Sequence, residues 1–347
     1  MTEASATETS VREPGVPATM GAWRVTGHGE PADVLRLDDV PVPAPGPGEV
    51  LVRVRAVAVN FPDVLLARGE YQVRPELPFI PGIELCGDVV SLGAGVQGLD
   101  PGERVVGSRI GVLSQYAVVP AQAVHRAPPE LDDAQAAALT IAYQTAWFGL
   151  HRRAGLQAGE HLLVHAAAGG VGTAAVQLGA AAGAEVIGVV GTAEKVEVAR
   201  AAGAKEVLVR AEVGDALAAR VKELTGGAGA DVVFDPVGGA AFEQSTRSIA
   251  FEGRIVVVGF AGGRLPDVRA NHVLVKNYSV LGLHWALYQE RRPDLVDAAH
   301  AELSRLAAAG AVRPVLGGVV AFEEAPAAVQ RLAGGATTGR LVVQVAD

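Results

Sequence analysis

The chain has 347 residues, of which 50% are hydrophobic and 19% are charged, and its formal net charge at pH 7 is −9. This length exceeds what one hydrophobic core usually takes, so two domains are expected, and the composition is globular rather than disordered. The negative charge gives no reason to expect nucleic acid or an anionic membrane as a partner. No apolar run reaches the roughly 20 residues of a transmembrane helix.

The first 19 residues are polar and contain no apolar segment like that of a signal peptide. We therefore expect a disordered tail over residues 1–19, a cytoplasmic protein, and either Met1 or Met20 as the natural start. The single cysteine, Cys86, excludes an intramolecular disulfide and a zinc site built from several cysteines. Its apolar surroundings predict a buried, unreactive thiol.

Short strands and irregular loops are predicted for residues 20–140, the first part of a first domain. Runs such as Val50–Val59 and Val89–Leu92 are rich in β-branched residues, as strands are. Turn signals at Pro45–Gly48 and Leu99–Gly102 separate such runs.

Strands and helices alternate from about Ala134 onward, which indicates a parallel sheet. The first unit is an apolar strand at His161–His165 and a helix over Val171–Ala182, whose small and apolar residues recur at spacings of three and four. Another helix is expected around Asp215–Leu224. The remaining predicted strands are Glu185–Val190, Glu206–Val209, Asp231–Asp235, Arg254–Phe260 and Ser279–Leu283.

The alternation ends after about His284. A helix around Pro293–Ala309 and a last strand at Arg340–Val345 follow. These two elements are too few for a third domain. We therefore expect residues 141–283 to form the second domain and residues 284–347 to return to the first.

The glycine-rich sequence AAAGGVG follows the first of these strands and opens its helix, as in a dinucleotide-binding βαβ unit. Ala167 stands where the first glycine of that fingerprint is usual. Glycines let the backbone approach a pyrophosphate, and the helix N-terminus favours its negative charge. A tight turn that simply needs small residues is the alternative. The predicted cofactor contacts are Ala168, Gly169, Gly170, Val171 and Gly172.

The end of the second strand indicates which cofactor is bound. An NAD enzyme usually has Asp or Glu there, about 20 residues past the glycines, to bind the ribose 2′-hydroxyl. This chain has Thr192 at that point, Lys195 three residues later, and Arg210 past the third strand. A hydroxyl and two cations suit a 2′-phosphate, so NADPH is predicted. Glu194 is interpreted as a first-turn residue of the next helix, and each cation alone could be a solvated surface residue.

The chain contains, in this order, the motifs PAPGPGEVLVRVRAVAVNFPDVLLARGEY, LPFIPGIELCGDVVSLGAGV, LLVHAAAGGVGTAAVQL, ELTGGAGADVVFDPVGG and ATTGRLVVQV. Together they resemble the zinc-free medium-chain dehydrogenases/reductases, in the quinone oxidoreductase branch that includes zeta-crystallin. The resemblance covers essentially everything after Met20. It implies an α/β protein with a GroES-like β-barrel catalytic domain, a Rossmann domain with a doubly wound parallel sheet, and a cleft for the cofactor between them.

The resemblance also predicts that no metal is bound. Zinc-dependent relatives have a cysteine ligand three residues before an aspartate, and later a Gly-His-Glu sequence. This chain has Asn60 before Asp63, and Ile83 in place of the histidine. An amide and an aliphatic side chain cannot replace thiolate and imidazole at a tetrahedral zinc ion.

The same resemblance implies the remaining site residues. Asn60 would lie beside the nicotinamide, Thr145 would line the same pocket, and Tyr71 would lie near the substrate, where enoyl reductases use a tyrosine as proton donor. Gln72 and Leu65 depart from the quinone reductase pattern, which has proline and a second tyrosine there. The alternatives are that Asn60 caps a turn and that Tyr71 is a packing residue. The nicotinamide end of the cleft would be lined by Val237, Gly238, Gly259 and Phe260.

The predicted function is hydride transfer from NADPH to a quinone or another electron-poor C=C or C=O acceptor. Reduction of an enoyl thioester or an alkenal is the alternative within the enzyme class, and a non-catalytic NADPH-binding structural protein is the alternative outside it. The apolar strand around Asn277–Leu283 is expected at a sheet edge, where it would pair with its symmetry mate in a homodimer.

Overall fold

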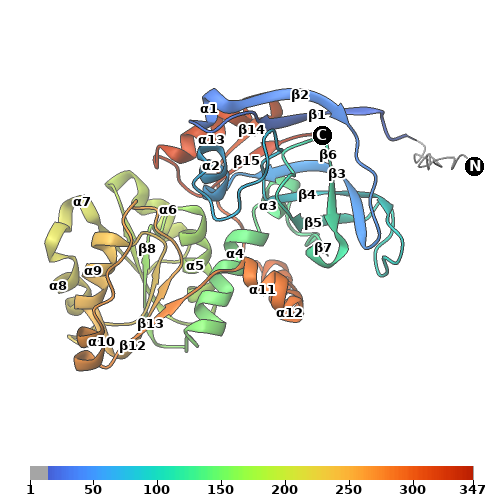
Figure 1. Cartoon of the computed structure of the whole chain (residues 1–347). Coiled ribbons are helices and arrows are strands. Elements are labelled where there is room, and N and C mark those ends of the chain that lie inside the picture. Colours follow the sequence, from blue (N-terminus) through green and yellow to red (C-terminus); the bar gives the residue numbers. More distant parts are fainter. Residues whose placement is uncertain (1–14, 347) are drawn as a thin grey trace, which may run out of the picture. The chain divides into compact units, whose positions relative to one another are not determined.

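A computed structural model of the chain describes residues 15–346 and separates them into two compact units. Figure 1 labels the elements of both. The first unit holds the residues up to Arg126, Val320–Ala333 and the segment from Val343 on, and the second holds Ala127–Val319 and Gly334–Val342. Residues 1–14 of the predicted tail lie outside the described part of the chain, and Thr19 already begins a strand.

The first unit is built mainly from antiparallel strands, as its sequence predicts. Strand β1 (Thr19–Val25) pairs with β2 (Leu35–Pro41), and a larger sheet has the order β14-β15-β3-β4-β5-β7, with β6 pairing with β3. The strands of the larger sheet are β3 (Glu49–Ala58), β4 (Glu84–Leu92), β5 (Arg104–Ser108), β6 (Tyr116–Pro120), β7 (Val124–Arg126), β14 (Leu316–Ala321) and β15 (Arg340–Gln344). The residues of β14 and β15 are divided between the two units.

Strand β3 lies in the middle of this sheet, and its apolar residues are buried, whereas Arg53 is exposed. Three helices of the same unit pack on one another: α1 (Pro31–Val34), α2 (Phe61–Arg68) and α13 (Ala325–Ala333). Helix α2 ends at Gly69, whose left-handed conformation (φ 71°) terminates the helix. Short 3₁₀ turns lie at η1 (Ala121–Ala123) and η5 (Phe322–Glu324).

The second unit contains a six-stranded parallel sheet of order β10-β9-β8-β11-β12-β13. Three strands have the predicted bounds: β8 (His161–His165), β9 (Glu185–Val190) and β10 (Glu206–Val209). The other three strands differ from their predicted bounds by one or more residues at their ends: β11 (Ala230–Asp235), β12 (Ile249–Val257) and β13 (Ser279–Gly282).

The largest difference concerns β12, which begins five residues before the predicted Arg254 and ends three residues before the predicted Phe260. Its pairing with β11 is irregular, since the register shifts between Ala230 and Val232. Glu252 has a positive φ of 59° within this stretch. A polar, irregular Glu-Gly segment gives no strand signal in the sequence, and the structure accommodates it as a bulge.

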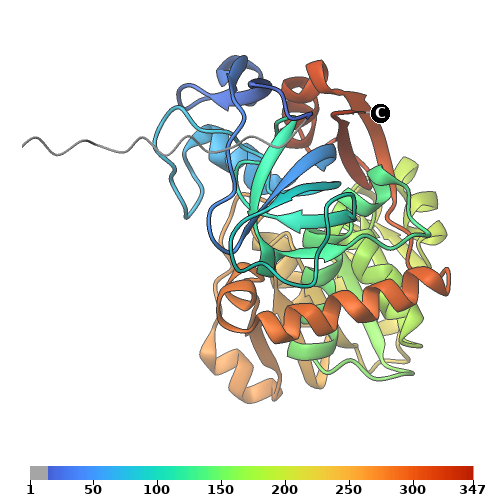
Figure 2. The ribbon, with the colours of Figure 1, turned by 90° about the vertical axis from the view of Figure 1, so that its right-hand side faces the viewer.

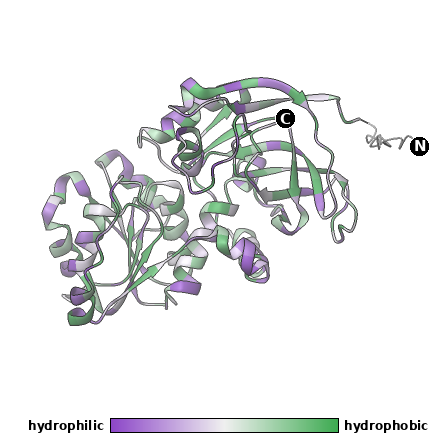
Figure 3. Ribbon diagram, viewed as in Figure 1, coloured by the Kyte–Doolittle hydropathy of each residue, from purple (hydrophilic) through white to green (hydrophobic). Residues whose placement is uncertain are grey.

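Helices cover both faces of the parallel sheet. Figure 1 shows α4 and α5 on one side and α7, α8 and α9 on the other, and Figure 3 shows the strands between them as largely hydrophobic. The helices and turns of this region are α3 (Asp133–Ala137), α4 (Thr140–Trp147), η2 (Phe148–Arg153), α5 (Gly170–Ala181), η3 (Ala193–Lys195), α6 (Val196–Ala201), α7 (Arg210–Val213), η4 (Gly214–Ala216), α8 (Leu217–Leu224), α9 (Gly239–Ser248) and α10 (Ala270–Lys276).

The order of the strands reverses between β8 and β11. From β8 the chain proceeds outward to β9 and β10, and it then crosses back to β11 on the other side of β8. The carboxyl ends of parallel strands at such a reversal form the usual binding crevice of a doubly wound sheet. The residues that follow β8, β9, β10, β11 and β12 are therefore where a ligand is expected.

Residues 284–319 group with the second unit, which differs from the predicted return of residues 284–347 to the first. Helices α11 (Ala286–Arg291) and α12 (Pro293–Ala308) follow β13, and α12 packs against α4. Figure 2 shows α12, in orange, running beside the green helices of this unit. The contact buries an apolar face of α12 in a cluster that contains Phe148, Trp285, Val296 and Ala299.

The second unit begins at Ala127, whereas the sequence predicted that the second domain begins at residue 141. Residues 334–342 belong to it as well. The Gly339 amide donates a hydrogen bond of 2.7 Å to the Ala168 carbonyl, and the Arg340 amide donates one of 2.7 Å to Val315. Over residues 15–346, the structure has no helix long and apolar enough to cross a membrane.

Candidate cofactor-binding and active site

The predicted glycine-rich turn joins β8 to α5 at the reversal of strand order. Gly169 is the N-cap of α5, and its amide donates to the Ala166 carbonyl at 2.8 Å. A Cβ atom on Gly172 would overlap that same carbonyl, so only glycine fits at this position. The turn therefore gathers Ala168, Gly169, Gly170, Val171 and Gly172 at the N-terminus of a helix, where free amides favour an anion.

Arg340 is a buried cation at this turn that sequence reasoning missed. A Cβ atom on Gly170 would lie 2.6 Å from its Cδ and 3.3 Å from its Nη1, so the side chain lies across the first residue of α5. Arg340 is 5% exposed and reaches the turn through the bridge between Gly169 and Gly339. Arg340 belongs to the sequence motif ATTGRLVVQV. Nothing in that motif shows which segment of the chain the Arg340 side chain contacts.

The structure places Thr192 and Lys195 together after β9. Thr192 is the N-cap of the turn η3, and Lys195 is its last residue. The Lys195 Nζ donates to the carbonyls of Gly335 at 3.2 Å and Thr337 at 3.3 Å, so it bonds to the C-terminal segment of the same unit. Glu194 accepts hydrogen bonds from its own amide and from the Thr192 hydroxyl, and these bonds lower the pKa of its exposed carboxyl group.

Arg210 begins α7, directly after β10. The Ala211 amide donates to the Gly191 carbonyl at 3.3 Å, so Arg210 also lies next to the end of β9. Its side chain does not extend into solvent but points inward, with Nη2 3.4 Å from Nδ1 of His165. Burial lowers the pKa of Arg210, and the negative charge of Asp235 opposes this effect.

The predicted nicotinamide-end residues meet after β11 and β12. The Asp235 Oδ1 atom accepts the amides of Val237 at 2.8 Å and Gly238 at 3.0 Å, which fixes this loop. A Cβ atom on Gly238 would lie 3.2 Å from the Phe260 ring, and one on Gly259 would lie 3.4 Å from the Pro236 carbonyl. Thr145 comes from α4, where it is buried.

Asn60 is the N-cap residue of α2, in the first unit, and is 3% exposed. Its amide nitrogen donates to the Ala58 carbonyl at 3.0 Å and to Glu84 Oε1 at 2.8 Å. Its backbone amide donates to Asp63 Oδ2 at 2.7 Å. The capping role that the sequence left open is therefore present, and the orientation of the amide depends on Glu84, which sequence reasoning did not single out.

Tyr71 lies just beyond the other end of α2 and is partly buried. Burial, and to a smaller extent the charge of Asp63, raises the pKa of its phenol. The hydroxyl therefore keeps its proton at neutral pH. A proton donor requires this state, but a tyrosine that only packs against its neighbours would also have it. Its role as a proton donor stays a prediction.

Among the described residues, no group of three or more His, Cys, Asp or Glu side chains is arranged to hold a metal ion. Cys86 is a fully buried residue of β4, as predicted. The absence of zinc itself stays a prediction, to be checked on the purified protein.

Sequence comparisons are consistent with this architecture. The profile described as "Alcohol dehydrogenase GroES-like domain" matches residues 46–129, and "Zinc-binding dehydrogenase" matches residues 170–301. The quinone oxidoreductase-like protein 2 of Bos taurus is 35% identical over 83% of this chain and 82% of its own length. The chain belongs to the quinone oxidoreductase branch of the medium-chain dehydrogenases/reductases.

Other members of this quinone oxidoreductase branch extend the comparison. The homologue from Nematostella vectensis is 43% identical over 69% of this chain, and the match spans 65% of that protein's length. The crystal structure of Escherichia coli quinone oxidoreductase complexed with NADPH is 30% identical, covers 94% of this chain and 100% of its own, and has a TM-score of 0.86. The predicted fold, a GroES-like domain with a Rossmann domain, is thereby confirmed.

Another comparison bears on the substrate. Erythronolide synthase of Saccharopolyspora erythraea is 36% identical over 83% of this chain, although the match spans 8% of that protein's length. This chain is thus also similar to a segment of a synthase, so the comparisons do not identify one acceptor.

Proposed function

We propose that this protein is a zinc-independent, NADPH-dependent oxidoreductase that transfers hydride to a quinone or another electron-poor C=C or C=O acceptor. The observation that carries the proposal is the glycine-rich turn at the N-terminus of α5, located where the strand order of the sheet reverses. Amides at that point favour the pyrophosphate of a dinucleotide. The similarity to the Escherichia coli enzyme, which was solved with NADPH, supports the same cofactor.

The residues of the chain would bind and orient, while the cofactor supplies the hydride. The turn at Gly169–Gly172 would hold the pyrophosphate, and Thr192, Lys195 and Arg210 would hold the 2′-phosphate. The loop that Asp235 fixes would position the nicotinamide through Val237 and Gly238. Asn60, Thr145, Gly259 and Phe260 complete the predicted set of cofactor contacts. Tyr71 would keep a proton ready for an acceptor that needs one.

The test is NADPH oxidation by the purified full chain with a panel of quinones, alkenals and enoyl-CoA esters. We expect turnover with at least one quinone and a lower KM for NADPH than for NADH. The proposal is wrong if the protein binds no dinucleotide in a direct titration. A protein that binds NADPH tightly and reduces no acceptor would instead be a non-catalytic binding protein.

Reduction of an enoyl thioester is the second candidate function. The similarity to erythronolide synthase favours it, as does Leu65, which stands where quinone reductases have a second pocket tyrosine. An enoyl substrate needs a proton at its α-carbon, whereas hydride transfer to a quinone places the negative charge on oxygen. A Tyr71→Phe variant that loses enoyl-CoA reduction but keeps quinone reduction would support this candidate and the proton-donor role together.

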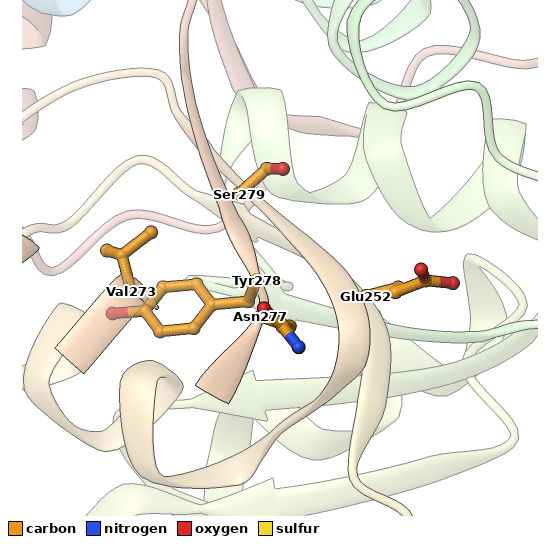
Figure 4. Close-up of a pocket in the computed structure, with 5 residues that line it drawn as sticks. All are labelled: Glu252, Val273, Asn277, Tyr278 and Ser279. Carbon is orange, nitrogen blue, oxygen red and sulfur yellow. The ribbon is translucent and has the colours of Figure 1, made fainter. Parts of the chain in front are cut away.

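We also propose a homodimer joined at β13, the last strand of the sheet order. Three large apolar side chains near this edge are strongly exposed: Phe251 at 71%, Leu274 at 75% and Val275 at 77%. A hollow of about 620 Å³ lies beside them, and Figure 4 shows Tyr278 and Val273 on one side of it and Glu252 on the other. Exposed apolar surface next to an open strand edge is typical of an interface.

A further inference from the structure

A buried group of polar side chains lies at the carboxyl ends of β8 and β11. His165 is the last residue of β8, Asp235 is the last residue of β11, and these strands are neighbours in the sheet. Ser245, on α9, completes the group, and all three residues are fully buried. Arg210 enters it from the end of β10. Burying polar side chains costs free energy unless they form hydrogen bonds. A buried polar group at this end of the sheet therefore indicates a functional role.

The hydrogen bonds fix the tautomer of His165. The Ser245 hydroxyl donates to the Ala241 carbonyl at 3.0 Å, as serines within helices do. A hydroxyl has one proton to donate, so at its 2.8 Å contact with Nε2 of His165 it acts as the acceptor. Nε2 therefore carries the ring proton and Nδ1 is an acceptor. Arg210 Nη2, at 3.4 Å, is its donor.

This arrangement requires a neutral imidazole. A proton on Nδ1 would face the N–H of Arg210 and bring two positive charges together. Burial is the main cause that lowers the pKa of His165, to about 4, and the charge of Arg210 lowers it further while Asp235 opposes both. At neutral pH the ring is thus available to accept from Arg210.

Asp235 adds an electrostatic component. Its Oδ1 atom accepts the amides of Val237 and Gly238, while its Oδ2 atom is buried and makes no hydrogen bond within the described residues. The negative charge favours the charged form of Arg210. Arg210 is therefore held inward by an acceptor, His165, and by a nearby anion.

We propose that His165 is a positioning residue that holds the Arg210 guanidinium at the ends of β8–β10 and thereby sets the preference for NADPH over NADH. This inference rests on the proposed function, in which Arg210 binds the 2′-phosphate. A guanidinium has five N–H donors, and the bond to His165 uses one of them, leaving its other edge for phosphate oxygens. A side chain that is already tethered loses less conformational freedom on binding.

The experiment is a fluorescence titration of the purified full chain with NADPH and with NADH, at neutral pH. His165→Leu removes the acceptor, and we expect the Kd for NADPH to rise about fivefold while the Kd for NADH changes less than about twofold. His165→Asn keeps an acceptor oxygen near the position of Nδ1, and it should restore most of the NADPH affinity.

The matched pair of variants lies on α9. Ser245→Ala removes the acceptor that fixes the tautomer, and we expect a rise of about two- to threefold in the Kd for NADPH alone. Thr246→Ala is the control, because Thr246 also bonds a helix carbonyl, Glu243 at 2.8 Å, but is not part of the buried group. Its affinities for both dinucleotides should match those of the unmodified protein.

A double-mutant cycle tests whether His165 acts through Arg210. In an Arg210→Ala background, His165→Leu should cause no further loss of NADPH affinity. Additive losses would overturn the inference, as would equal losses for NADPH and NADH. If His165→Leu does not fold, the comparison of Ser245→Ala with Thr246→Ala decides: an NADPH-specific loss supports the inference, and unchanged affinities overturn it.

The outcomes also separate this inference from the proposed function. If the unmodified protein binds neither dinucleotide, or prefers NADH, the assignment of NADPH fails before any variant is considered. If it prefers NADPH and the His165 and Ser245 variants keep that preference, the cofactor assignment stands and only the positioning role fails.

Discussion

Thr192 and Glu194 share a hydrogen bond at the place where the 2′-phosphate is proposed to bind. A bound phosphate would compete with the Glu194 carboxylate for the Thr192 hydroxyl, and the two negative charges would repel each other. Most of the preference for NADPH must therefore come from the cations Lys195 and Arg210. Of these, Lys195 donates to the carbonyls of Gly335 and Thr337, whereas Arg210 points inward to His165.

Replacing Lys195 with alanine should raise the Kd for NADPH about tenfold, because a charge-assisted contact contributes on the order of 1.5–3 kcal/mol and about 1.4 kcal/mol corresponds to tenfold. The Kd for NADH should stay nearly unchanged. Fluorescence titration measures both. Arg200→Ala is the control, since Arg200 is an exposed cation of α6 that pairs with Glu197. An equal loss for both dinucleotides would mean that Lys195 acts only through its bonds to Gly335 and Thr337.

Replacing Gly172 with alanine should destabilise the turn. The added Cβ would overlap the Ala166 carbonyl, which forces the backbone to shift and costs on the order of 1–3 kcal/mol. We expect a lower Tm and loss of dinucleotide binding. Gly27→Ala is the control, because Gly27 has nothing within 4 Å of its Cβ position and no positive φ. A variant that binds NADPH normally would show that the turn is not the pyrophosphate site.

The glycine-rich turn could be predicted from the sequence because its residues are contiguous and lie between a strand and a helix. The contacts that site residues make with distant parts of the chain could not be predicted. Arg340 lies beside Gly170, Glu84 bonds to Asn60 and Ser245 bonds to His165, and only the fold shows these three contacts. Arg210 was identified as a cation just past the third strand, but nothing local showed that its side chain would point inward to His165.

Among the elements, the strands that are short apolar runs between clear turns were predicted to the residue, as β8, β9 and β10 show. Prediction was poorer where the pattern is broken. Strand β12 contains a bulge at Glu252, and the start of the strand was missed. Helices α11 and α12 carry an ordinary amphipathic pattern, and periodicity shows that such a helix buries a face without showing against which unit.

The edge strand β13 and the neighbouring helix α10 should hold the dimer together. Leu274→Glu with Val275→Glu places charges on exposed positions of α10, so the fold should persist while the interface is lost. Light scattering should give twice the chain mass for the unmodified protein and one chain mass for the variant. Leu37→Glu, at an exposed position of β2, is the control and should remain dimeric. An unmodified protein that is monomeric at working concentration would contradict the interface.

For the whole molecule, the similarity to a family described as zinc-binding makes metal content a decisive measurement. We expect no stoichiometric zinc by elemental analysis, because Asn60 and Ile83 occupy the positions at which zinc-dependent relatives have ligands. Chelators should leave NADPH oxidation unchanged. One zinc ion per chain, with activity lost on chelation, would show that other residues provide a site.

The segment 334–342 has a consequence for biosynthesis. Gly339 bonds to Ala168 beside the glycine-rich turn, and the carbonyls of Gly335 and Thr337 hold Lys195. The ribosome synthesises β8, β9 and the turn more than a hundred residues before it reaches this segment. The Rossmann strands can therefore assemble early, but the nucleotide pocket is completed only when this late segment emerges and docks. Until then the growing chain would have little ability to capture its cofactor.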